Sequence, residues 1–359
     1  MMNKHFYIDI HAIQTLPPSC VNRDDTGSPK TAVYGGVERA RVSSQAWKRA
    51  MREYFKDIFA PEKLGSRTKR IPELLAAKIA MLSPEMTAEK ADEAALNVLK
   101  TVGIKVEEKS GQNAALFFIS EQQLEKLAEL AAAGGTDKNA YKEAMKEHPS
   151  FDIVLFGRMV ADDPDLNYDA ASQVAHAIST HAVHTEYDYF TAVDDGQKED
   201  ESGAGHLGTV EFNSATMYRY ATLNVAELKE HLSDDTAAVV RGFVEAFVRS
   251  MPTGKQNTFA NRTLPDLVYV TVRGDQPVNL SGAFECAVKN EKDGYVTKSC
   301  KALLTYADKV CSAFADAPLL ALGCGDADIL DGHAEALPFR ELLDRLETYT
   351  AEHCDEVTK

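Results

Sequence analysis

The chain has 359 residues, an apolar fraction of 44% and a formal net charge of −16 at pH 7. This length exceeds one ordinary domain, and no apolar run approaches a membrane span or a signal-peptide core, so we expect a cytoplasmic protein with no membrane partner. Six cysteines are scattered without a Cys-x-x-Cys pair, which argues against a zinc site or a disulfide framework.

The N-terminal segment predicts a strand followed by an irregular loop. Residues 6–13 alternate between apolar and polar types, as in a half-buried strand. Residues 16–36 contain PPSCVNRDDTGSPK and a Gly-Gly pair, and this richness in Pro, Gly, Asn and Asp indicates a loop without regular structure.

Residues 38–70 concentrate the positive charge of the chain. This stretch holds ten Lys or Arg residues and four acidic residues, a net charge of +6, so the rest of the chain carries −22. Apolar side chains from Trp47 to Ile58 fall at helical spacing. Lys48, Arg52 and Lys56 repeat every four residues, which predicts a cationic stripe along that helix, with Arg49 beside it. In an acidic protein, such a concentration favours a polyanion held in one groove.

The start of this helix offers groups that bind phosphate. Ser43, Ser44 and Gln45 supply hydroxyls, an amide and backbone N–H groups where the helix dipole favours negative charge. Arg39 and Arg41 alternate on the approach, so we expect both side chains on one side of an extended segment. Together these residues predict a nucleic-acid backbone site without base readout. The alternative is a solvated helix face with several cations.

The rest of the chain predicts a helical block and then a return to strands. Periodic apolar runs between about Ile71 and Val183 indicate helices at IPELLAAKIAML, AEKADEAALNVLKTVG, EQQLEKLAELAAAGG, NAYKEAMKEH and ASQVAHAISTHAV. Strands are expected at 186–193, 207–220 and 266–273, and helices at 235–250, 279–289, 297–314 and 337–353. Without the helical block the order is βαββαβ, the ferredoxin-like plan that RNA-recognition modules share, so the fold class is α+β.

Two features of the helical block have both a structural and a functional interpretation. Lys138, Lys142 and Lys146 are spaced by four residues, and with the intervening glutamates they form either a salt-bridged solvent face or a contact with duplex DNA. Met159, in the sequence FGRMV, either fills the core or wedges between bases of a bound RNA.

An enzymatic site has weak support. Asp24 and Asp25 are adjacent carboxylates that either brace a turn or hold Mg2+ for phosphodiester cleavage. The histidines and aspartates between His176 and His206 are residue types that bind metal ions, but they form no HExxH or HxHxD motif. The sequence shows no catalytic nucleophile with a matching general base, no P-loop and no dinucleotide-binding fingerprint.

Several long motifs resemble one known family. The segments PSCVNRDD, YGGVERARVSSQAWKRAMR, FGRM, AHAISTHAV, DYFTAVDD, GAGHLGTVEF and YRYA are similar to the CasC family, the repeated backbone subunit of the type I-E CRISPR surveillance complex Cascade. The resemblance implies a hand-like fold: an RNA-recognition-motif-like palm at 1–58 and 214–359, helical fingers inserted at 59–184, and a β-hairpin thumb at 185–213.

The resemblance also implies a function. It indicates a non-catalytic subunit without a cofactor that binds guide RNA (crRNA) and supports RNA-guided binding of target DNA in antiviral defence. The implied partners are crRNA, target DNA, other Cascade subunits and further copies of the chain in a helical filament. Two alternatives stay open: a general single-stranded RNA-binding protein, and a metal-dependent ribonuclease of the type III backbone kind that uses Asp24.

Motif by motif, the resemblance assigns site residues. The implied guide-RNA contacts are Arg23, Ser43, Gln45, Lys48, Arg49, Arg52, Lys255, Gln256 and Asn257, with Met159 as the base wedge. The implied thumb residues, which displace bases, are Tyr189, Phe190, Thr191, Val193 and His206. Lys138, Lys142 and Lys146 lie in the fingers region where family members hold duplex DNA.

Overall fold

The computed structural model describes residues 5–107, 109–160, 163–192, 206–290 and 292–356. The chain divides into two compact units. The first unit comprises Met1–Met51, Val174–Leu223 and Phe243–Lys359, and the second comprises Arg52–Gln173 and Asn224–Gly242. The second unit differs at both ends from the range 59–184 expected for the helical insertion, and it also takes in residues 224–242.

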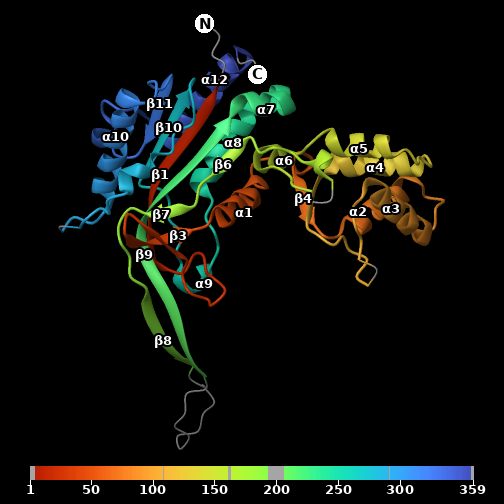
Figure 1. Cartoon of the computed structure of the whole chain (residues 1–359), viewed down its shortest axis with the longest axis horizontal. Coiled ribbons are helices and arrows are strands. Elements are labelled where there is room, and N and C mark those ends of the chain that lie inside the picture. The colour runs from red at the N-terminus through yellow and green to blue at the C-terminus, as the bar shows by residue number, and fades with distance from the viewer. Residues whose placement is uncertain (1–4, 108, 161–162, 193–205, 291, 357–359) are drawn as a thin grey trace, which may run out of the picture. The chain divides into compact units, whose positions relative to one another are not determined.

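Within the described ranges, ten strands form one sheet (Figure 1), which is the core of the first unit. The path runs β12, β11, β10, β1, β9, β7, β3, β2, and β6 and β8 each pair with β9. The strands are β1 (Tyr7–Ser19), β2 (Thr31–Tyr34), β3 (Val37–Val42), β6 (Ser172–Val174), β7 (Ala177–Ser179), β8 (Glu186–Ala192), β9 (His206–Asn224), β10 (Leu267–Arg273), β11 (Leu320–Cys324) and β12 (Glu335–Ala336).

Side-chain alternation gives this sheet two faces. Ile8 and Ile10 of β1 are fully buried on one face, as the sequence predicted. On the other face, Ile13 packs with Leu303 of α10 (Val296–Ala313) and with Tyr269 of β10. β1 and β10 are antiparallel, with Ile10 opposite Val270 in the register.

The remaining helices that lie wholly or partly in the first unit are α1 (Ser44–Phe55), α8 (Thr236–Arg249), α9 (Gln256–Phe259), α11 (Ala327–Leu330) and α12 (Phe339–His353). The sequence predicted α1, α8 and α12, whereas the short helices α9 and α11 were not predicted. The helix expected at 279–289 is only a 3-10 turn, Leu280–Phe284. Asn279 is the N-cap of this turn: its backbone is extended and its side chain accepts a hydrogen bond from the Ser281 N–H.

Two predictions for this unit are wrong. The segment 16–36 is not wholly irregular, because β1 continues to Ser19 and β2 pairs with β3 across a turn at Gly35 and Gly36, both with positive φ. The segment 171–183 is not a helix. It contains β6 and β7, and β7 pairs with both β3 and β9, so tertiary strand pairing overrides the helical spacing of its apolar residues.

The second unit is mainly helical. It contains β4 (Gly65–Thr68), α2 (Ile71–Leu82), α3 (Ala88–Val102), β5 (Phe117–Ser120), α4 (Glu121–Ala132), α5 (Lys138–Lys146), α6 (Phe151–Phe156) and α7 (Val225–Leu232). The amphipathic periods of the sequence predicted α2 to α5, whose apolar faces form one buried cluster. The pair β4 and β5 was not predicted, since strands of four residues give little periodicity.

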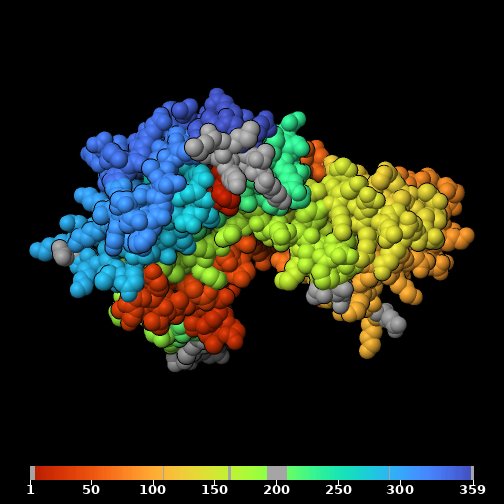
Figure 2. All heavy atoms as spheres, turned by 45° about the horizontal axis from the view of Figure 1, so that its top comes forward, coloured from red at the N-terminus to blue at the C-terminus, as the bar shows by residue number. Residues whose placement is uncertain are grey.

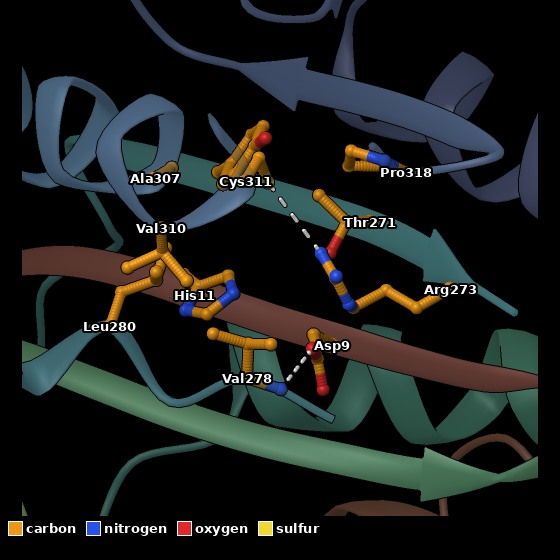
Figure 3. Close-up of a pocket in the computed structure, with 11 residues that line it drawn as sticks. Asp9, His11, Thr271, Arg273, Val278, Leu280, Ala307, Val310, Cys311 and Pro318 are labelled. Atoms are coloured by element: carbon orange, nitrogen blue, oxygen red, sulfur yellow. Dashed lines mark hydrogen bonds between the residues drawn. The ribbon is translucent and has the colours of Figure 1, made fainter. Parts of the chain in front are cut away.

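A small pocket lies between β1, β10 and α10 (Figure 3). Asp9, His11 and Arg273 line it. The Tyr220 hydroxyl donates to Asp9 Oδ1 at 2.9 Å, and the Val278 N–H donates to Asp9 Oδ2 at 2.8 Å. Burial raises the pKa of Asp9 to about 6, and these hydrogen bonds lower it only in part.

We predict that the stability of the Asp9→Asn variant, compared with that of wild type, increases as pH rises. The folded state holds the Asp9 proton up to about pH 6, whereas the unfolded state releases it near 3.8, so wild type loses stability between these values. The difference amounts to about 2 to 3 kcal/mol at pH 7. Urea unfolding of both proteins at pH 4 and pH 7 measures it, and an equal pH response of the two proteins would refute the role of Asp9.

Candidate nucleic-acid interface

Three segments of the first unit meet at the N-terminus of α1. The Ser43 N–H donates to Oδ1 of Asn22 at 2.9 Å, which ties the loop after β1 to the helix. The Ser43 hydroxyl accepts from the Ala46 N–H at 3.3 Å, as an N-cap does. The Ser44 N–H donates to Nδ1 of His176, between β6 and β7, at 3.2 Å. The loop, the helix and the β6–β7 connection are therefore joined by hydrogen bonds.

Positive side chains surround this helix start. Arg41 Nη1 lies 3.5 Å from Nδ1 of His176. Burial and then the charges of Arg41 and Lys30 lower the pKa of His176. Lys48 is half-buried, and burial lowers its pKa, while Arg49 is exposed one residue further along α1. Cations and the positive end of the helix dipole thus share one surface.

Residues 254–257 lie against the loop that follows β1. A Cβ at Gly254 would lie 2.0 Å from the Val21 carbonyl oxygen, so only glycine permits this approach. Lys255 follows in the left-handed region with φ 51°. Burial raises the pKa of the Cys20 thiol, and the charges of Arg23 and Lys255 both oppose that rise. Arg23 and Lys255 therefore lie near the same thiol.

The structure thus brings most of the assigned RNA contacts together in the first unit. They are Arg23, Ser43, Gln45, Lys48, Arg49, Lys255, Gln256 and Asn257. Ser43 is buried as the helix cap, whereas Arg23, Gln45, Arg49 and Asn257 are exposed. The loop after β1 and the β2–β3 hairpin form a surface of this unit, in red in Figure 2.

Sequence reasoning missed three residues at this surface. Asn22 and Lys30 lie in the loop that was expected to be irregular, and His176 was weighed only as a metal ligand in an expected helix. Only the motif PSCVNRDD pointed toward Asn22. The positions of His176 and Lys30 at this surface follow only from the tertiary structure, in which β6 and β7 bring residue 176 to the helix start.

The prediction for Arg39 is wrong. Its side chain is fully buried and does not face a ligand beside Arg41. Its guanidinium donates to the carbonyl oxygens of Tyr34 at 3.2 Å, Ser179 at 3.1 Å and Phe284 at 2.9 Å. Arg39 therefore fastens the β2–β3 hairpin to β7 and to the 3-10 turn.

The cationic stripe is partly paired at its C-terminal half. In the second unit, Arg52 Nε lies 3.1 Å from Oδ2 of the buried Asp152, and its guanidinium lies 4.4 Å from the ring centroid of Phe118. Lys56 forms an ion pair of 2.6 Å with Glu53. The sequence predicted an unbroken stripe of accessible cations at 48, 52 and 56. The accessible part of this stripe is shorter, because Arg52 has an internal partner.

Met159 lies on the surface of the second unit, not in its core. Its side chain is 86% exposed, which rules out core filling. The preceding Arg158 is buried and donates to the carbonyl oxygens of Leu166 at 2.9 Å, Phe118 at 3.1 Å and Met145 at 2.8 Å. A firmly held backbone therefore presents an apolar, exposed side chain, as a base wedge requires.

The lysine row on α5 is divided. Lys142 pairs with Asp163 at 2.6 Å and with Asp165 at 3.3 Å, so its charge is neutralised by residues other than the glutamates of its own helix. Lys138 and Lys146 are exposed. A contact with duplex DNA remains a prediction for these two lysines.

The expected thumb is an antiparallel hairpin of β8 and β9. Tyr189 pairs with Thr209 and Phe190 with Gly208 in the register, and the side chains of Tyr189, Phe190 and Thr191 are exposed. Val193 lies outside the described residues. His206 begins β9, but its side chain lies outside the description.

Asp24 braces a turn. Its Oδ1 accepts from the Thr26 hydroxyl at 2.7 Å, the Thr26 N–H at 2.9 Å and the Ser28 N–H at 3.0 Å, and the hydrogen bond from the Thr26 hydroxyl is the main cause of its lowered pKa. In the part of the chain that the structure describes, no group of three His, Cys, Asp or Glu side chains is arranged to hold a metal ion.

The comparisons with known proteins identify the family. The CT1975-like protein family matches residues 8–347, so the chain belongs to it. A chain of a "CRISPR RNA-guided surveillance complex, pre-nicking" is 35% identical with a TM-score of 0.84, and the match covers 96% of this chain and 99% of that one. A chain of a "CRISPR RNA-guided surveillance complex" is 31% identical with a TM-score of 0.64 and the same coverage. Among curated proteins, none matches.

These findings confirm the resemblance to the Cascade backbone family and the mixed α+β class. Among the described residues, no helix is long and apolar enough to cross a membrane.

We predict that Met159→Ala changes the free energy of unfolding by less than about 0.5 kcal/mol, because the side chain is exposed. The matched control is Met145→Ala, which removes a fully buried methionine of the same unit and should cost about 2 to 5 kcal/mol. Chemical denaturation measures both, and a large loss for Met159→Ala would restore the core-filling interpretation.

Proposed function

We propose that this chain is a non-catalytic backbone subunit that binds guide RNA through the surface at the start of α1. The observation that carries the proposal is the convergence, in one unit, of a capped helix N-terminus with Arg23, Arg49 and Lys255. A helix N-terminus and several cations bind phosphate oxygens without reading sequence. Such a contact suits a guide whose sequence differs from one RNA to the next.

The division of labour follows from this mode of binding. The protein holds the RNA backbone, so the bases stay available for pairing with target DNA. Exposed Met159 supports a wedge between bases, and exposed Lys138 and Lys146 support a contact with the target duplex. The similar solved structures are chains of RNA-guided surveillance complexes, which supports assembly with other Cascade subunits.

The hand-like arrangement is part of this proposal. The order β10, β1, β9, β7, with α1 and α8 in the chain between these strands, supports a ferredoxin-like palm. The mainly helical character of the second unit supports its assignment as the fingers, and the β8–β9 hairpin supports the assignment of a thumb. Exposed Tyr189 and Phe190 on that hairpin support contact with RNA or with a neighbouring copy in a head-to-tail filament.

Charge reversal at the helix start tests the proposed site. The double variant Lys48→Glu, Arg49→Glu should lower affinity for single-stranded RNA by at least about tenfold and reduce the salt slope of log K by about 1.4, since two phosphate contacts are lost. Fluorescence anisotropy over a series of salt concentrations measures both quantities.

The matched control is Lys301→Glu, Lys309→Glu on α10, which reverses two exposed lysines of the same unit. It should leave the salt slope unchanged, and equal losses for both double variants would refute a localised site. Arg52 is unsuitable for reversal, because a glutamate there would face the buried Asp152 and destabilise the fold.

We predict that the assembled complex leaves its RNA intact with Mg2+ present, because Asp24 holds a turn with its carboxylate. Gel analysis of end-labelled RNA over time measures this, with Asp24→Ala as the control. Cleavage that disappears in Asp24→Ala would favour the ribonuclease alternative. Equally tight binding of unrelated RNA without partner subunits would favour a general RNA-binding protein.

A further inference from the structure

Arg219, in the motif YRYA, is the residue whose position the proposed function leaves unexplained. It lies in β9 and is 2% exposed. Its guanidinium is placed between two aromatic rings, 3.6 Å from the ring centroid of Trp47 in α1 and 4.4 Å from that of Phe247 in α8. Nη1 donates to Oε1 of Gln14 at 2.6 Å, and Nη2 donates to the Phe247 carbonyl oxygen.

This buried cation has no carboxylate partner among the described residues. Burial alone lowers its pKa to about 9, with no neighbouring acid to oppose the shift, so it stays charged at pH 7. Its Nε has no hydrogen-bond partner in the described part of the chain, and neither has Nε1 of Trp47. Burying a charge without a counter-charge costs free energy, and the two hydrogen bonds and the two aromatic contacts offset this cost.

The location of this charge suggests a role in addition to packing. Trp47 is on the buried side of α1, two residues after Gln45 and two before Arg49. A charge enclosed by aromatic rings is weakly screened by salt and by water. It acts on an anion at the helix surface in the same direction as the helix dipole.

We propose that Arg219 is a positioning residue of the RNA site. It fixes the rotation of α1 through Trp47, and its unpaired charge adds to the positive potential that the start of α1 presents to RNA phosphates. This inference rests on the proposed function. Arg219 itself touches no phosphate, because it is enclosed by α1, α8 and the sheet.

The test compares Arg219→Met, which keeps length and packing but removes the charge, with Arg219→Lys, which keeps the charge. Thermal unfolding and binding of a fluorescent single-stranded RNA are measured on the full chain at several salt concentrations. Arg219→Met should melt below wild type, because Gln14 Oε1 and the Phe247 carbonyl lose their donor, and it should bind RNA about fivefold more weakly, with an unchanged salt slope. Arg219→Lys should bind within about twofold of wild type even if it melts lower.

A folded Arg219→Met that binds RNA as wild type does would overturn the inference, since a purely structural arginine predicts that result. If Arg219→Met does not fold, Arg219→Lys decides: wild-type affinity supports the role of the charge, and a loss of fivefold or more contradicts it. The proposed function fails separately, when reversal of Lys48 and Arg49 leaves RNA binding and its salt slope unchanged.

Discussion

Among the described residues of this acidic chain four arginines are buried, and only Arg273 has a carboxylate partner, Asp275; the other three have none in ion-pair contact. Arg39 and Arg158 donate to backbone carbonyls, and Arg219 is held between two aromatic rings. Each fixes a segment that the proposed site uses: the β2–β3 hairpin before α1, the backbone before Met159, and α1 itself. Movement of one of these segments would break the contacts of its arginine and leave a buried cation uncompensated, which is costly. These segments therefore have little freedom to move.

The charge distribution acquires a physical meaning from this arrangement. The cations of residues 38–70 do not form one continuous surface. Some are interior supports, such as Arg39, and some have internal carboxylate partners, such as Arg52. Of the accessible remainder, Arg49 lies in the first unit, which also holds Arg23 and Lys255 from other parts of the chain. Under the proposed function, the surrounding net charge of −22 opposes RNA binding elsewhere on the chain.

Local periodicity predicted the elements whose stability is local. The helix α1 and helices α2 to α5 have clear amphipathic patterns, and the first strand alternates as expected. The prediction of a helix around His176 was wrong because the short strands there are defined by pairing with the distant strands β3 and β9. No local pattern carries that information.

The site was predictable in its residue types and much less so in its geometry. Sequence pattern indicated the helix start, and the family motifs added Arg23 and Lys255. The sequence could not distinguish an arginine that is accessible to a ligand from one that supports the fold, because Arg39 and Arg41 alternate on one strand, yet Arg39 is buried and Arg41 is not. Burial depends on the tertiary fold. The exposure of Met159 likewise depends on how Arg158 is anchored.

Ultraviolet cross-linking of the purified RNA-bound complex, with mass-spectrometric identification of the linked peptides, tests the central claim most directly. The account predicts that cross-links in the first unit fall within residues 20–30, 43–49 and 254–257. Cross-links concentrated on α10 and α12, with none in those three segments, would contradict it.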